Sequence, residues 1–108
     1  MLISGAMIYT FGNFELDTAQ RELRDGGKPV PVEPQVFRLL QLLLENRQRL
    51  VPRDEVIAEI WHGRAVSDSA VTSRIKTLRQ ILGDDGKAQR LVRTVHGEGF
   101  RFVGSVTA

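Results

Sequence analysis

Residues 69–82 combine an apolar stripe with a face of short polar side chains. The apolar side chains recur at i, i+4, i+7 and i+11: Val71, Ile75, Leu78 and Leu82. This spacing predicts an amphipathic helix with one buried face. The opposite face holds hydroxyl, amide and amine groups and no carboxylate: Ser69, Thr72, Ser73, Lys76, Thr77 and Gln80. Such side chains let a helix approach base edges in the major groove of a duplex. The alternative interpretation is an amphipathic surface helix with no ligand.

A glycine-bearing hairpin is predicted after this helix. Residues 91–95 and 100–103 are rich in β-branched and aromatic side chains, and His96-Gly97-Glu98-Gly99 between them is typical of a hairpin tip. Basic residues are concentrated in this part of the chain, because residues 74–108 carry a net charge of +4 and residues 1–73 a net charge of −2. This asymmetry indicates a polyanionic partner, with a solvated basic surface as the alternative.

Three further segments are expected to position these residues. Residues 8–33 have apolar side chains near a period of two and turn signals at Gly12 and Gly26, which predicts a small antiparallel sheet. Residues 35–46 and 53–61 change to a helical period. The predicted order is a sheet, three helices and a hairpin, an α+β arrangement in which the second and third helices form a helix-turn-helix.

Two segments carry a resemblance to a known family. Residues 71–84 (VTSRIKTLRQILGD) resemble the recognition helix of OmpR/PhoB-type and ToxR/CadC-like winged helix-turn-helix regulators of bacterial transcription. Residues 93–102 (RTVHGEGFRF) are similar to the wing of the same family. Weaker matches at residues 14–16 and 35–40 and at Trp61 extend the likeness over roughly residues 8–104. Both main motifs at this spacing are highly specific.

The resemblance implies a winged helix-turn-helix fold and sequence-specific binding of double-stranded DNA, with helix 69–82 in the major groove and hairpin 91–103 in the minor groove. At the matching positions, the implied base-reading residues are Thr72, Ser73, Lys76 and Thr77. Contacts with the DNA backbone are implied for Ser69, Arg74, Arg79, Arg93 and Thr94, and His96 and Gly97 are implied at the wing tip. For Arg74, Arg79 and Thr94, bracing of the helix is the alternative role. Many members carry arginine where Thr77 stands, so this face is less basic than is usual in the family and the exact base contacts are left open.

The resemblance also implies protein partners. In some members of the family, the loop between the second and third helices touches RNA polymerase, and its matching residues are His62, Gly63, Arg64 and Ala65. Members often bind DNA as two copies arranged head to tail. The mild polar face and the low net charge of +2 leave an alternative open, a winged helix that binds only other proteins.

Composition argues against several other functions. The absence of cysteine removes disulfides, thiol catalysis and thiolate metal sites. His62 and His96 are the only histidines, and no ligand spacing accompanies them, so we expect neither a metal nor a cofactor. A set such as Ser67, Asp68 and His96 arises by chance in most chains, so we expect no enzymatic activity. No apolar run is long enough for a membrane span and the start is no secretory signal, so we expect a cytoplasmic protein without membrane contact.

The length predicts one domain. We expect it to cover residues 8–104, with residues 1–7 as a leader or a cloning remnant and residues 105–108 as a C-terminal tail. The 108 residues leave no room for the receiver domain of a phosphorelay regulator or for the membrane and sensor parts of a ToxR-like protein. We therefore expect either an excised module or regulation supplied from elsewhere.

Overall fold

The structure is a computed structural model and describes residues 6–108, so most of the expected leader (residues 1–5) lies outside the described residues. It begins with a four-stranded antiparallel sheet in the order β1-β2-β3-β4, which confirms the predicted first sheet. The strands are β1 (Ile8–Phe11), β2 (Phe14–Asp17), β3 (Glu22–Asp25) and β4 (Lys28–Val30). Alternation along them buries one face, which carries Tyr9, Phe11, Leu16 and Leu23.

Three helices follow the sheet: α1 (Pro34–Glu45), α2 (Arg53–Trp61) and α3 (Asp68–Ile81). Each bound lies within one residue of the predicted range. Pro34 occupies the first turn of α1, where its missing N–H costs nothing. Ser67 caps α3, because its Oγ accepts a hydrogen bond from the Ala70 N–H at 3.2 Å. The apolar stripe of α3 is buried as predicted.

A second sheet has the order β5-β7-β6 and consists of β5 (Val51–Pro52), β6 (Val92–Val95) and β7 (Gly99–Phe102). The hairpin β6–β7 is the predicted wing. Strand β5 was not predicted, and it pairs with β7 through Val51–Phe100 and Pro52–Gly99. The backbones come so close at Gly99 that a Cβ added there would lie 2.2 Å from the Val51 carbonyl oxygen.

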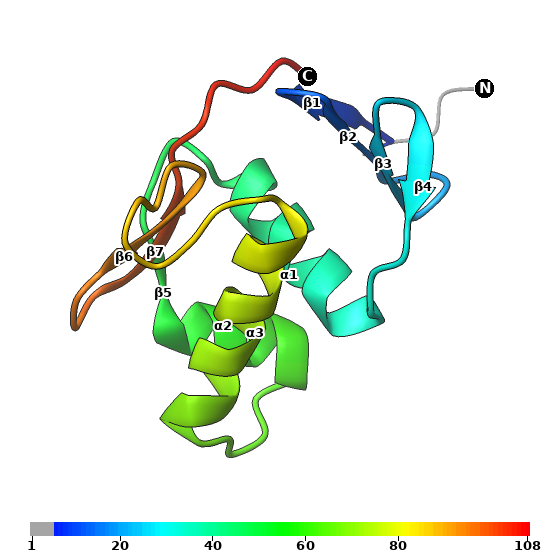
Figure 1. Cartoon of the computed structure of the whole chain (residues 1–108). Coiled ribbons are helices and arrows are strands. Elements are labelled where there is room, and N and C mark those ends of the chain that lie inside the picture. Colours follow the sequence, from blue (N-terminus) through cyan, green and yellow to red (C-terminus); the bar gives the residue numbers. More distant parts are fainter. Residues whose placement is uncertain (1–5) are drawn as a thin grey trace.

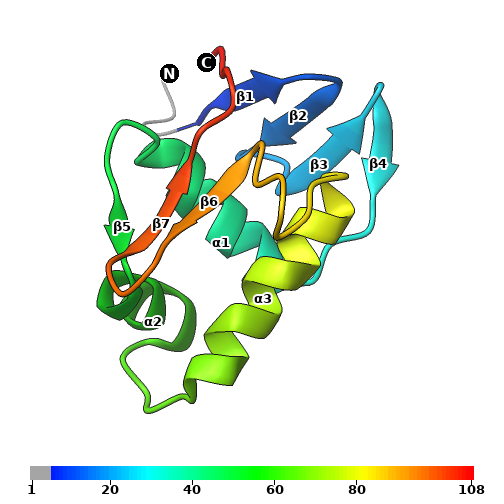
Figure 2. The ribbon, with the colours of Figure 1, turned by 60° about the vertical axis from the view of Figure 1, so that its left-hand side comes forward.

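Helix α1 lies at the centre of the molecule and contacts α2, α3 and β7 (Figure 1). Its buried side chains join residues from both sheets and from α3 in one core. In both ribbon views the four-stranded sheet lies at one end of the molecule, and the wing tip and the start of α3 lie toward the other (Figure 2). The chain returns to the first sheet after β7, because Thr107 and Thr10 exchange backbone hydrogen bonds of 2.7 and 2.9 Å.

Candidate nucleic-acid interface

One face of α3 stays open to solvent over most of its length. Four of its predicted contact residues are exposed: Ser69, Thr72, Ser73 and Lys76. Thr77 is half-buried, and Gln80 beyond it is exposed. The described residues place no carboxylate on this face after Asp68 at the first turn. The helix therefore presents short polar groups and one amine on its solvent-exposed face.

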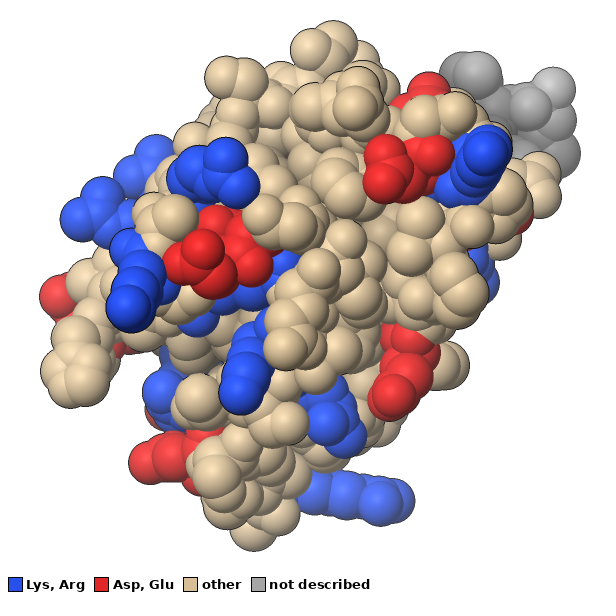
Figure 3. Space-filling view, viewed as in Figure 1, with Lys and Arg blue, Asp and Glu red and all other residues tan. Residues whose placement is uncertain are grey.

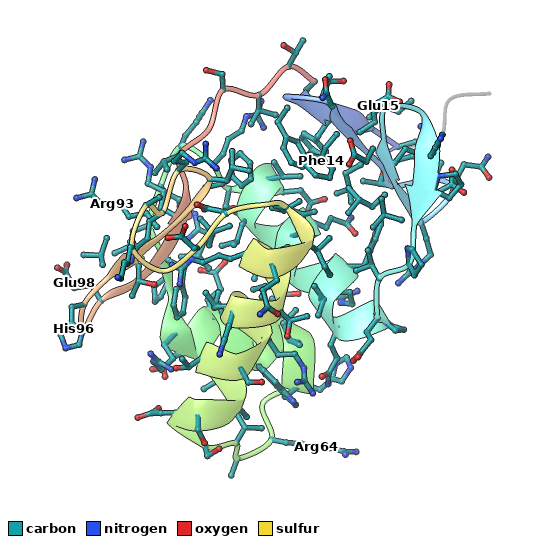
Figure 4. The ribbon with its side chains drawn as sticks, viewed as in Figure 1. Phe14, Glu15, Arg64, Arg93, His96 and Glu98 are labelled. Atoms are coloured by element: carbon teal, nitrogen blue, oxygen red, sulfur yellow. The ribbon has the colours of Figure 1, made fainter. Side chains whose placement is uncertain are left out.

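The wing projects from the side of α3 and ends in an exposed tip. Figure 4 shows His96 and Glu98 at this tip and Arg93 further back on the same hairpin. His96 and Gly97 are both exposed, and Gly97 takes a positive φ of 75° that glycine adopts without strain. Thr94 is half-buried and its N–H donates to Gln89 Oε1 at 2.9 Å, which ties the base of the wing to the loop before it.

Arg79 joins α3 to the wing. Its Nε donates to the Val92 carbonyl at 3.0 Å and its Nη2 to Thr94 Oγ1 at 2.8 Å, and the residue is only 9% exposed. Burial lowers the pKa of this guanidinium, and the nearby carboxylates of Asp84 and Asp85 act in the opposite direction. Both donors are directed at β6, so Arg79 fixes the distance between the recognition helix and the hairpin.

Asp84, in the loop that follows α3, ties that loop to the start of β6. Its carboxylate accepts four backbone N–H bonds of 2.8 to 3.1 Å, from Asp85, Arg90, Leu91 and Val92. Burial alone would raise the pKa of this carboxyl, but the four donors outweigh it and lower the pKa to about 2. No local sequence pattern predicts these hydrogen bonds, because three of the donors come from residues 90–92, which reach Asp84 only after the loop folds back.

Two further arginines lie beside α3. Arg74 is half-buried and its Nε donates to Gln35 Oε1 of α1 at 2.9 Å, so it holds the helix against the core. Arg53, to which the sequence motifs assign no role, begins α2 with its guanidinium over the Phe100 ring at 5.4 Å. Its Nη1 lies 3.7 Å from Asp68 Oδ1 at the start of α3. The signal available in the sequence was a basic residue at a helix start, where acidic residues are usual.

An open groove of about 450 Å³ separates the wing from the beginnings of α2 and α3. It is lined by Arg53, Asp54 and Asp68 on one side and by residues 94–99 on the other. In the space-filling view, Lys and Arg side chains gather over the wing and along α3, with acidic groups between them (Figure 3). The basic residues thus lie on the same side as the polar face of α3.

The loop between α2 and α3 stands apart from the wing. His62, Gly63, Arg64 and Ala65 are all exposed, and Arg64 extends away from the molecule at its lower end in Figure 4. Within residues 6–108, no three His, Asp or Glu side chains converge as a metal-binding group. No helix in this part of the chain is long and apolar enough to cross a membrane.

A helix-turn-helix formed by α2 and α3, followed by a hairpin braced against α3, defines a winged helix-turn-helix domain. A family profile described as "Transcriptional regulatory protein, C terminal" matches residues 27–102. The chain belongs to this family, the C-terminal DNA-binding domains of OmpR/PhoB-type transcriptional regulators.

Similar proteins agree with this assignment to the family. The phosphate regulon regulator PhoB of Pseudomonas aeruginosa is 33% identical over 92 residues, which cover 84% of this chain and 39% of PhoB. The chain therefore spans about two fifths of the length of that relative. The Thermotoga maritima response regulator DrrB, an OmpR/PhoB homologue, has a TM-score of 0.80 at 29% identity, over 90% of this chain and 44% of DrrB.

The DNA-binding domain of Klebsiella pneumoniae RstA, solved in complex with the RstA box, is similar in fold. Its TM-score is 0.79 at 24% identity, over 89% of this chain and 96% of that one. The resemblance stated from the sequence and the predicted fold are therefore confirmed.

Proposed function

We propose that this domain recognises a particular sequence in double-stranded DNA, with α3 in the major groove and the wing in the adjacent minor groove. The observation that carries the proposal is the exposed face of α3, which has no acidic residue after Asp68, beside an exposed wing tip and across a groove from it. The major groove of B-DNA is wide enough for a helix, and a hairpin tip with glycine at its end is narrow enough for the minor groove. A duplex partner would place the domain in the bacterial cytoplasm, where the chromosome lies.

The proposed base-reading residues are those of the exposed face: Thr72, Ser73, Lys76 and Thr77. Ser69, Arg93 and Thr94 are proposed to contact phosphates, and His96 and Gly97 to enter the minor groove. Arg74 and Arg79 bond to other parts of the protein, so we assign them the positioning of α3. Arg53 lines the groove, and we propose that its positive charge attracts a phosphate of the duplex.

Selection of bound duplexes from a random pool, followed by footprinting, tests the proposal directly. With the preferred site known, Lys76→Ala and Thr77→Ala are expected to weaken binding to it more than binding to random DNA, because a good base contact contributes about 1–3 kcal/mol of discrimination. Lys28→Ala on the exposed strand β4 is the matched control and should change neither affinity.

Equal losses on all sequences would show that Lys76 and Thr77 do not read bases. An absence of duplex binding even at low salt, together with a tightly bound protein partner, would instead favour the protein-interaction module.

Two further partners follow from the same proposal. The exposed loop at residues 62–65 is proposed to contact RNA polymerase, which predicts that Arg64→Ala lowers transcription while leaving DNA affinity unchanged. Two copies are proposed to bind head to tail, so footprints should cover direct repeats. Independent binding to a single half-site at all concentrations would argue against the second copy.

A further inference from the structure

Two arginines lie opposite each other on the outer face of the wing. Arg93 of β6 and Arg101 of β7 are paired in register, so their side chains leave the hairpin on the same face. Their neighbours Val92, Phe100 and Phe102 are buried against the core, so the arginines face away from it. Both are exposed, and Figure 4 shows Arg93 pointing away from α3.

The register places two positive charges opposite each other on the hairpin. Like charges directly opposite across two strands repel each other and destabilise a hairpin. Among the ion pairs within residues 6–108, none includes Arg93 or Arg101. The Nε of Arg101 does donate to the Arg47 carbonyl oxygen at 3.5 Å, a contact that supplies no negative charge. The pair therefore suits an external anion that lies across both guanidinium groups.

The position of the pair along the wing indicates which anion this is. Arg93 precedes His96 by three residues, which at about 3.3 Å per residue places it roughly 10 Å back from the tip. The minor groove is about 7.5 Å deep, so a tip at its floor would bring the pair to the rim, where the phosphates lie. The inner face of the wing, with Thr94, turns toward α3 and so toward the strand that separates the two grooves.

We propose that Arg93 and Arg101 together clamp phosphates on the far wall of the minor groove, on the strand that α3 does not face. This inference rests on the proposed docking of the wing and adds Arg101 and a defined strand to it. The clamp would extend the DNA contact beyond the recognition helix and set how deeply the wing enters. It would not read bases, because phosphates carry no sequence information.

The test measures duplex affinity as a function of salt for Arg93→Gln/Arg101→Gln against the charge-matched control Lys28→Gln/Arg38→Gln on β4 and α1. Each lost phosphate contact should reduce the slope of log K against log salt by about 0.9. The wing variant should therefore lose a slope of about 1.8, or about 30-fold in affinity at 0.15 M salt, on preferred and random sites alike. The control should keep the wild-type slope.

A second arm locates the contact. Neutral methylphosphonate links at the far-wall phosphates should weaken wild-type binding and have no further effect on the wing variant. The same links on the strand between the grooves should weaken both proteins equally. Removing the like-charge pair should also raise the Tm of the wing variant by about 2 °C, which separates lost contact from a damaged fold.

The outcomes are distinguishable. Wild-type protein that binds no duplex defeats the proposed function itself. Wild-type protein that binds, with an unchanged salt slope in the wing variant or with methylphosphonate sensitivity retained by that variant, overturns only the clamp. An acidic protein that loses affinity for the wing variant while DNA binding stays unchanged would likewise overturn it.

Discussion

Replacing Asp84 with asparagine should destabilise the link between α3 and β6. The carboxylate has two oxygens that accept four backbone N–H groups, two on each oxygen. Asparagine keeps one oxygen and turns an NH₂ group toward the other two donors. A buried donor left without an acceptor costs about 1–3 kcal/mol, so the variant should lose about 3 kcal/mol of unfolding free energy at pH 7.

The pKa of Asp84 gives a second, independent measure. The folded-state pKa is about 2 against an ordinary value of 3.8. Because the pKa is lowered on folding, the ionised group stabilises the fold above pH 3.8, and this contribution disappears as the pH falls toward 2. At 1.36 kcal/mol per pKa unit the contribution is about 2 kcal/mol. Asp84→Asn lacks this component, so the stability gap between the two proteins should narrow by about 2 kcal/mol between pH 4 and pH 2.

Urea unfolding followed by the fluorescence of Trp61, the single tryptophan, measures both quantities. Other carboxylates whose pKa is lowered, such as Asp17 and Glu55, are present in both proteins and cancel in the difference. A gap below about 1 kcal/mol at pH 7, or a gap that stays constant from pH 7 to pH 2, would refute the four hydrogen bonds to Asp84 as a source of stability.

Two further substitutions test local features of the fold. Gly99→Ala should lower the free energy of unfolding by about 3 kcal/mol and weaken DNA binding, because the new Cβ would lie 2.2 Å from the Val51 carbonyl oxygen and force β5 away from β7. Urea unfolding measures the loss, and a value below about 1 kcal/mol would contradict the close approach. Ser67→Ala should remove the cap of α3 at a cost of about 1 kcal/mol, measurable by thermal unfolding. Ser67→Asp should recover the lost stability, because its carboxylate can accept the same hydrogen bond. An unchanged Tm in Ser67→Ala would show that the cap does not contribute.

The helices and the wing could be predicted because their signals are local. The stripe on α3 and the capping residue Ser67 define one helix without reference to the rest of the chain, and glycines at 97 and 99 mark the wing tip. The family motifs, which combine these signals, identified the fold and the class of protein. Those parts of the candidate site that lie on exposed local elements were therefore available from the sequence.

The missing parts depend on contacts between distant segments. Strand β5 has only two residues, too few for a periodic pattern, and becomes a strand only because β7 pairs with it. The resemblance left Arg79 either to contact phosphate or to brace the helix, and only the folded chain shows the two acceptors on β6 that it bonds. The bridge from Thr107 to Thr10 joins the two ends of residues 8–107, and no local pattern marks either residue.

Strand β5 runs directly into α2, because Pro52 ends the strand and Arg53 begins the helix. The wing is therefore joined to α2 through β5, with no residue between the strand and the helix. A shift of the hairpin on binding a duplex would move the start of α2, and through that helix the exposed loop at residues 62–65. Docking of the wing in the minor groove would thus change the position of the loop that is proposed to contact RNA polymerase.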